Sequence, residues 1–337
     1  MLKTIGDRIL TTIPALIGVV LVSFLLTRVL PGDTAAYFAG PAATPQAIAE
    51  VKAKLGLDKP LPEQFAKYVV DLAHGDLGQS LTTGQPVLAD LTSRLPASAE
   101  LTLFGLILSL VIAIPLGVVA AVRQGSAVDH ICRVVVTAGV SLPVFFTGLI
   151  LVYVFYFILQ WSPAPLGRID VFATTPPTVT GFYLIDSLVV GDYEAFRSAL
   201  SQMLLPGVTL AIFSLAPIAR ITRASMISAL SAEFTRTAKA SGLSPRRVIV
   251  TYALRNALLP VVTTLGMVFS FLLGANVLVE KVFAWPGVGS YAVEALIASD
   301  FAPVQGFVLA MAIIYVVLNL LIDLAYGVID PRVRMSS

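Results

Sequence analysis

The stretch that decides the fold is LTLFGLILSLVIAIPLGVVAAV, which runs from Leu101 to Val122. A helix rises about 1.5 Å per residue, so roughly 20 apolar residues cross the 30 Å hydrocarbon core of a bilayer. This stretch is long enough to do so and contains no Asp, Glu, Lys or Arg. It predicts a transmembrane helix.

Five further stretches of similar length also lack charged residues. They cover approximately Ile9–Thr27, Val134–Trp161, Met203–Ala219, Ala257–Val279 and Phe301–Ile322. The first has a longer apolar run than a signal peptide and no clear cleavage site after it, so we interpret it as a retained anchor. The stretch Val134–Trp161, the third span in chain order, is long enough to tilt or to extend beyond the lipid. The sequence therefore predicts an all-α membrane protein with six transmembrane helices.

The composition agrees with this prediction. Of the 337 residues, 57% are hydrophobic and 12% are charged, whereas an average soluble domain has about 25% charged residues. A soluble enzyme is therefore excluded. The single cysteine, Cys132, forms no internal disulfide, and the two histidines, His74 and His130, are too few for a metal site.

The distribution of charge predicts the orientation. Lys and Arg gather on one side of the predicted spans, at Lys3, Arg8, Arg123, Arg133, Arg220, Arg223, Arg236, Lys239, Arg246, Arg247, Arg255, Arg332 and Arg334. Most acidic residues fall on the other side. By the positive-inside rule, both termini are expected to be cytoplasmic.

The outer connections carry some structure of their own. Thr44-Pro45 and Pro62 are start signals for two helices, and a third short helix is expected to end before Pro96. One more short helix is expected near 182–190. We therefore divide the chain into an N-terminus with the first span (1–30), an extracytoplasmic helical segment (31–100) and a core (101–337).

The cytoplasmic connection, residues 220–256, is the most informative part of the chain. Its composition predicts a short helix over Glu233–Ser241 that stops at Gly242, and a second helix that starts at Ser244-Pro245 and runs to Pro260. Composition alone leaves two interpretations open. The segment is either an interfacial amphipathic linker that attracts anionic lipid or a docking element for another protein.

Several motifs in and around this connection resemble those of one family. They are EFTRTAKASGL (233–243), ALRNALLP (253–260), RVLPGD (28–33), LGLDKP (55–60), GDLGQS (75–80), RLPAS (94–98), VFAWPG (282–287) and IDPR (329–332). Their order and spacing resemble the permease subunits of bacterial ABC importers, in the dipeptide/oligopeptide branch. The strict Glu-Ala-Ala triplet of the family's cytoplasmic EAA loop is absent here.

This resemblance implies a type I importer permease in the bacterial inner membrane. The expected partners are a second homologous permease (commonly a different chain), two ABC ATPases, an extracytoplasmic solute-binding protein and membrane lipid, and no nucleic acid. ATP and Mg²⁺ would be bound by the ATPases, so this chain needs no cofactor. The helix that couples to the ATPase would be formed by Glu233, Phe234, Arg236, Thr237, Ala238, Lys239, Gly242 and Leu243.

Motifs for other functions are missing or lack the right context. No P-loop, H-E-x-x-H or G-x-S-x-G sequence occurs. Residues 287–292 fit G-x-G-x-x-A, but without a βαβ pattern we expect a tight turn at the outer leaflet. We therefore expect no catalytic residues.

The spans themselves suggest packing. Gly266, Ser270 and Gly274 recur every four residues in the fifth span, which is typical of close helix packing. Pro115, Pro143 and Pro217 are candidate kinks. Arg28 and Asp323 lie near the ends of spans, where pairing or snorkelling is expected.

Two other function classes remain as alternatives. A secondary, ion-gradient-driven carrier would need titratable groups near the bilayer midplane, which the spans lack. A structural scaffold without transport is the other. Within the family, dipeptides or oligopeptides are the expected substrates, and glutathione or nickel chelates are further ones.

Overall fold

The computed structural model describes residues 13–14, 16–25, 35 and 43–329, except for the side chains of 54–55 and 323–329. Within these ranges the chain is helical apart from turns, loops and one isolated bridge between Gln79 and Pro86. The prediction of an all-α protein is confirmed. Arg28 and the side chain of Asp323 lie outside the described residues, as do the two ends of the first predicted span.

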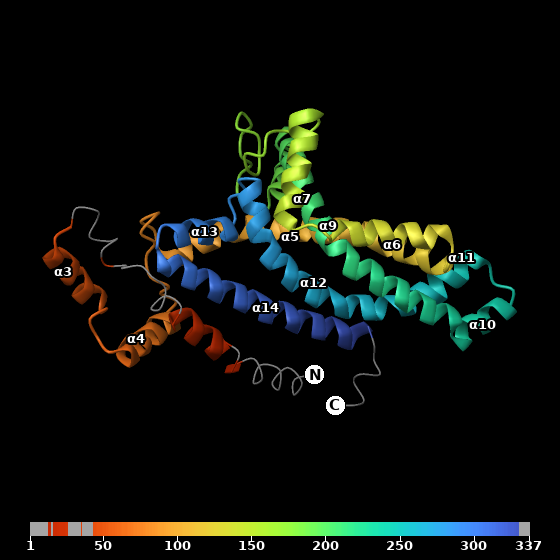
Figure 1. Ribbon diagram of the computed structural model, residues 1–337, viewed down its shortest axis with the longest axis horizontal. Coiled ribbons are helices and arrows are strands. Elements are labelled where there is room, and N and C mark those ends of the chain that lie inside the picture. Colours follow the sequence, from red (N-terminus) through yellow and green to blue (C-terminus); the bar gives the residue numbers. More distant parts are fainter. Residues whose placement is uncertain (1–12, 15, 26–34, 36–42, 330–337) are drawn as a thin grey trace. The chain divides into compact units, whose positions relative to one another are not determined.

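Figure 1 shows the long helices of the chain. The α-helices are α3 (Pro45–Leu55), α4 (Leu61–Ala73), α5 (Val87–Val122), α6 (Ala127–Gly139), α7 (Val144–Leu151), α8 (Tyr183–Val190), α9 (Tyr193–Ser231), α10 (Glu233–Ala240), α11 (Pro245–Arg247), α12 (Arg255–Val282), α13 (Val288–Ile297) and α14 (Phe301–Ile329). Two π-helices, η1 (Val152–Ile158) and η2 (Val248–Leu254), lie between them. The chain divides into two units, one of Met1–Pro96 with Pro286–Val317 and one of Ala97–Trp285 with Leu318–Ser337.

Four described helices are long and apolar enough to cross a membrane. They are Val87–Val122, Tyr193–Ser231, Pro245–Val282 and Phe301–Ile322. They contain the second, fourth, fifth and sixth predicted spans, and all but the last begin well before the apolar stretch. Of the first predicted span, Leu16–Leu25 is described as a shorter apolar helix.

The third predicted span is not one helix. Helix α6 and the continuous α7–η1 segment (Val144–Ile158) are long and apolar enough to cross a membrane only when taken together, and they are bent by 98° at the break between them. Pro143 is the N-cap residue of α7. Proline disfavours helical backbone in the residue before it and lacks an N–H, so the helix stops here and restarts. The expectation of a tilted or extended single helix is wrong, whereas the bend expected at Pro143 is present.

Other prolines do not interrupt their helices. Helix α5 runs through Pro96 and Pro115, so the separate short helix expected before Pro96 is wrong. Helix α12 likewise contains Pro260, where the cytoplasmic helix was expected to end. In a membrane, free backbone groups cost several kcal/mol each, which favours a continuous helix over an open end.

The short helices α3, α4 and α8 form where the sequence predicted them. Thr44 caps α3 by accepting a hydrogen bond from the Ala47 N–H at 3.3 Å, and Gly56 ends it with a left-handed φ of 69°. Helices α4 and α8 also form where they were expected. Gly287, in contrast, precedes the ten-residue helix α13 and not a simple turn.

Helices α5 and α9 approach each other closely at several glycines. A Cβ atom added to Gly105 would lie 2.7 Å from the Leu210 Cβ, and one added to Gly207 would overlap the Phe104 ring. Gly117 is similarly close to Thr222. Glycine allows this approach because it has no side chain, and small residues have this role in membrane helix pairs.

Candidate functional site: the connection between α9 and α12

Helix α10 lies between two sharp changes in backbone direction. Ala232, between α9 and α10, has an extended backbone with φ −69° and ψ 152°. After α10 the chain turns at Gly242, whose φ is 75°, a left-handed conformation that glycine adopts without steric cost. The N–H of Gly242 donates to the Lys239 carbonyl at 3.0 Å. The predicted helix and its glycine stop are therefore present.

One side of α10 is fixed to its own chain. The side chain of Thr235 is fully buried, and its hydroxyl donates a hydrogen bond to the Ala229 carbonyl, at the end of α9, at 2.6 Å. Ala238, one turn later, is also buried, and α10 contacts both α9 and η2. Because Thr235 is bonded to the last turns of α9, the end of α9 sets the orientation of α10.

The other side of α10 is exposed. It presents Phe234, which is 42% exposed, together with Glu233, Arg236, Thr237 and Lys239. Glu233 and Arg236 form an ion pair at 3.0 Å, one turn apart, and pairs so exposed contribute little to stability. Among the described residues Lys239 has no ion pair. The result is an aromatic ring flanked by cations on an otherwise polar surface.

Two residues predicted for this surface lie elsewhere. Ala238 lies on the buried side of α10. Leu243 follows the glycine turn, is partly buried, and donates its N–H to the Ala238 carbonyl at 3.4 Å. Ser244 precedes α11, as predicted, but its side chain makes no cap hydrogen bond.

The predicted packing residues of α12 differ from one another in their surroundings. A Cβ atom added to Gly266 would lie 2.9 Å from the Ile322 side chain. Ser270 donates its hydroxyl to the Gly266 carbonyl at 2.8 Å, whereas no atom lies within 4 Å of a Cβ added to Gly274. Close helix packing along these three residues thus stays a prediction, and of the two glycines only Gly266 has a close neighbour on another helix.

The structure contains buried ion pairs that the sequence did not predict. Arg223 of α9 binds the buried Asp129 carboxylate with two nitrogens, at 2.8 and 2.7 Å. Arg168 binds Glu100 at 2.5 Å, with both side chains less than 10% exposed. The available signal was position, because Glu100 directly precedes an apolar span and Asp129 lies among basic residues.

A second missed group is the carboxylate of Glu280. It is fully buried in the last turn of α12 and accepts hydrogen bonds from Ser98 and from Asn276 at 2.5 and 2.9 Å. Nearby, the Trp285 indole N–H donates to the Ala97 carbonyl at 2.9 Å. These bonds connect the C-terminal end of α12 to α5. In the part of the chain that is described, no three His, Cys, Asp or Glu residues are placed to hold a metal ion.

The long apolar helices define a polytopic membrane protein, and comparison with known proteins gives its family. Residues 113–335 match the family "Binding-protein-dependent transport system inner membrane component", and residues 1–102 match the N-terminal component of the same systems. The chain belongs to this family.

Curated relatives extend the similarity over almost the full length. The chain is 44% identical to the probable D,D-dipeptide transport system permease protein DdpB of Escherichia coli K12, over 94% of this chain and 93% of the relative. It is 40% identical to the di/tripeptide transport system permease protein DppB of Pseudomonas aeruginosa and 41% identical to the dipeptide permease DppB of Haemophilus influenzae. Coverage is 99% of this chain in both cases, with 99% and 100% of the relatives.

The family membership decides between the function classes. The chain is the membrane subunit of an ABC importer, and the ATPase activity of such systems lies in separate subunits. The alternative of a secondary carrier is set aside. The chain is accordingly a multi-pass inner-membrane protein.

Proposed function

We propose that this chain forms half of the translocation pathway of a dipeptide importer. In the proposed arrangement, six helices cross the membrane with both termini in the cytoplasm, and residues 31–100 form an outer helical segment. A second permease completes the pathway, two ABC ATPases bind inside, and a solute-binding protein delivers the substrate outside. The excess of Lys and Arg on the proposed inner side supports the orientation.

The observation that carries the coupling role is the two-sided character of α10. Its buried side is bonded to the end of α9 through Thr235, and its exposed side presents Phe234 and Lys239. A helix fixed in this way moves together with α9, so a force applied to its exposed side reaches a membrane-spanning helix. The exposed residues of α10 would bind the ATPase, with Phe234 in an apolar groove and Lys239 near acidic groups.

The substrate proposal rests on the relatives. One is named as a D,D-dipeptide permease and the others as dipeptide or di/tripeptide permeases. We therefore assign dipeptides to this importer. Uptake of radiolabelled L-Ala-L-Ala and D-Ala-D-Ala by cells with and without the chain tests the assignment. Loss of uptake of at least one of them on deletion supports it, and unchanged uptake of both contradicts it.

The coupling role is tested by reversing one charge on α10. In the reconstituted importer, Lys239→Glu is expected to lower dipeptide-dependent ATP hydrolysis and dipeptide uptake together by tenfold or more. Gly242→Val is expected to do the same, because valine at a φ of 75° is strained and would change the direction in which the chain leaves α10.

Arg123→Glu is the matched control, since it makes the same charge change at an exposed residue in the turn between α5 and α6. It should leave both activities within twofold of the unchanged protein. Equal activity of Lys239→Glu and the unchanged importer, with all subunits assembled, would show that α10 does not couple.

A further inference from the structure

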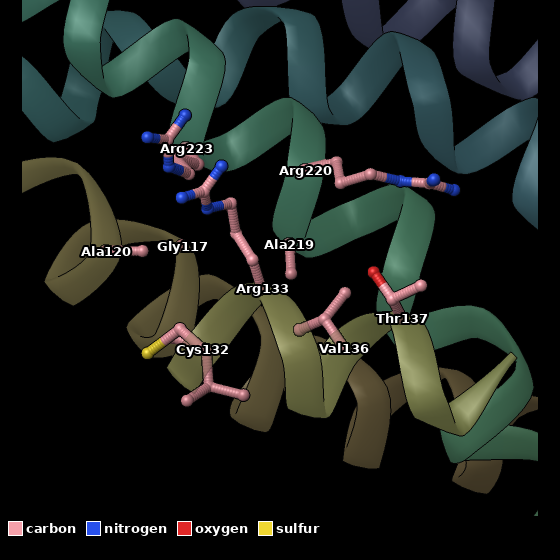
Figure 2. Close-up of a pocket in the computed structure, with 10 residues that line it drawn as sticks. Gly117, Ala120, Cys132, Arg133, Val136, Thr137, Ala219, Arg220 and Arg223 are labelled. Atoms are coloured by element: carbon pink, nitrogen blue, oxygen red, sulfur yellow. The ribbon is translucent and has the colours of Figure 1, made fainter. Parts of the chain in front are cut away.

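We propose that the pocket between α5, α6 and α9 binds the headgroup of an anionic phospholipid. The cavity encloses about 270 Å³, slightly below the usual size of small-molecule sites. Three arginines line it, Arg133 from α6 and Arg220 and Arg223 from α9. Figure 2 shows the Arg133 side chain extending toward Arg223, while Arg220 extends in a different direction.

The charges around the pocket do not balance. Asp129 is the acidic partner of two of the arginines, bound by Arg223 at 2.7 Å and lying 3.6 Å from Arg133. Arg220 has no ion pair among the described residues. Three guanidinium groups around one carboxylate leave a formal surplus of two positive charges. A phosphodiester fits this surplus, since guanidinium binds phosphate with two parallel hydrogen bonds.

Apart from Thr137, the rest of the pocket lining carries no strongly polar side chain, which favours a lipid over a free anion. Leu116 and Ala120 of α5 and Val136 of α6 contribute to its wall. Next to it on α6, Val134 and Val135 are 68% and 56% exposed. These apolar side chains would contact the acyl chains of a lipid, while the arginines would bind its headgroup.

The depth of the pocket also suits a headgroup. Ala120 lies two residues before the end of α5 at Val122, about 3 Å along the helix axis. The pocket is therefore at one end of the membrane-spanning helices, on the side where Arg123 and the other basic residues gather. Basic pockets between helices at this level bind anionic lipid headgroups in other membrane proteins.

Cys132 provides the measurement. It is the one cysteine of the sequence and it lines the pocket, so the rate of its alkylation by N-ethylmaleimide reports on occupancy. The full-length chain in detergent micelles is mixed with phosphatidylglycerol, which is anionic, or with phosphatidylcholine, which has no net charge. Phosphatidylglycerol is expected to slow alkylation at least fivefold and phosphatidylcholine less than twofold. Native mass spectrometry should show phosphatidylglycerol retained on the chain.

Two variants separate this site from general surface charge. Arg133→Gln/Arg220→Gln keeps the Asp129–Arg223 pair and is expected to abolish the protection of Cys132. Arg246→Gln/Arg247→Gln removes the same charge from exposed residues of α11 that do not line the pocket and should keep it. The native mass spectra of the unchanged chain need no variant, so the test stands even if the first variant fails to fold.

Other results would overturn the proposal. Equal protection by both lipids would mean that the arginines do not select charge. Protection by inorganic phosphate alone would identify a free-anion site. Protection in phosphatidylcholine that appears only when the partner subunits are present would show that a protein covers the pocket. Because none of these measurements depends on ATP hydrolysis or uptake, they succeed or fail independently of the coupling role.

Discussion

The substitution Arg168→Met tests how the connection between η1 and α8 (residues 159–182) is held. Arg168 donates hydrogen bonds to Glu100 at 2.5 Å and to the Gly181 carbonyl at 2.7 Å, and its guanidinium carbon lies 3.6 Å from the centre of the Tyr183 ring. Methionine fills similar space but removes both hydrogen bonds and the charge. The Glu100 carboxylate then stays buried with the Leu184 N–H, at 2.8 Å, as its remaining partner.

The expected cost follows from that burial. The two side chains are 7% and 6% exposed, and removing one partner of such a pair costs about 3 to 5 kcal/mol. At about 1.4 kcal/mol per factor of ten, local opening becomes roughly a hundredfold to a few thousandfold more frequent. The ring contact is included in this range, because the contributions of neighbouring groups do not add.

Hydrogen exchange measures the opening directly. In the purified chain, the Leu184 amide is protected by its bond to Glu100, so Arg168→Met should accelerate its exchange by at least a hundredfold. The control is Arg197→Met, the same replacement at an exposed arginine of α9, which should change exchange less than threefold.

A double variant isolates the buried charge. Glu100→Gln/Arg168→Met leaves no uncompensated carboxylate, so it should be more stable than Arg168→Met alone. If Arg168→Met exchanges at the same rate as the unchanged chain, the reasoning that this ion pair holds the connection is refuted.

Three further predictions concern packing, the coupling helix and pH. Gly117→Ala should lower the free energy of unfolding of the detergent-solubilised chain by about 1 to 3 kcal/mol, because its Cβ would lie 2.7 Å from a side-chain atom and 2.8 Å from a carbonyl of α9. Gly274→Ala, whose Cβ would have no atom within 4 Å, should instead stabilise α12 by up to about 1 kcal/mol. Equal effects of the two substitutions in thermal unfolding would contradict the packing. Thr235→Val should destabilise the α9–α10 junction by about 1 to 3 kcal/mol, since the Ala229 carbonyl loses its hydroxyl donor. The check is hydrogen exchange of the α10 amides, which should be faster in Thr235→Val than in the control variant Thr237→Val, whose substituted residue is exposed. Burial raises the pKa of Asp186, but hydrogen bonds from Thr180, Val179 and Gly181 outweigh burial and hold the pKa below its ordinary value. The stability that the ionised Asp186 provides is therefore present above about pH 4 and is lost as the pH falls through the folded-state pKa. Proteolysis of residues 178–190 should accelerate on acidification of the unchanged chain, and Asp186→Asn should show no such acid step.

Some features of this protein depend on local composition, and the sequence alone determined them. Charge-free stretches such as Leu101–Val122 must be helical in lipid, because no water is present to bond a free backbone. The ends of α3 and α10 follow from Thr44 and Gly242, whose effects act within one turn. The family motifs are equally a property of the linear chain.

The tertiary structure decided whatever depends on partners distant in sequence. Pro143 lies at the break between α6 and α7, whereas Pro96 and Pro260 lie inside continuous helices, and the residue type is the same in all three. Thr235 and Ala238 were indistinguishable from their exposed neighbours until α9 and η2 packed against them.

The charges show the same division between sequence and structure. The sequence separated basic from acidic residues and so gave an orientation. It did not show that Asp129 joins an arginine 94 positions away, or that Glu100 joins Arg168. Burying a charge is favourable only with its partner in place, and folding alone brings those partners together.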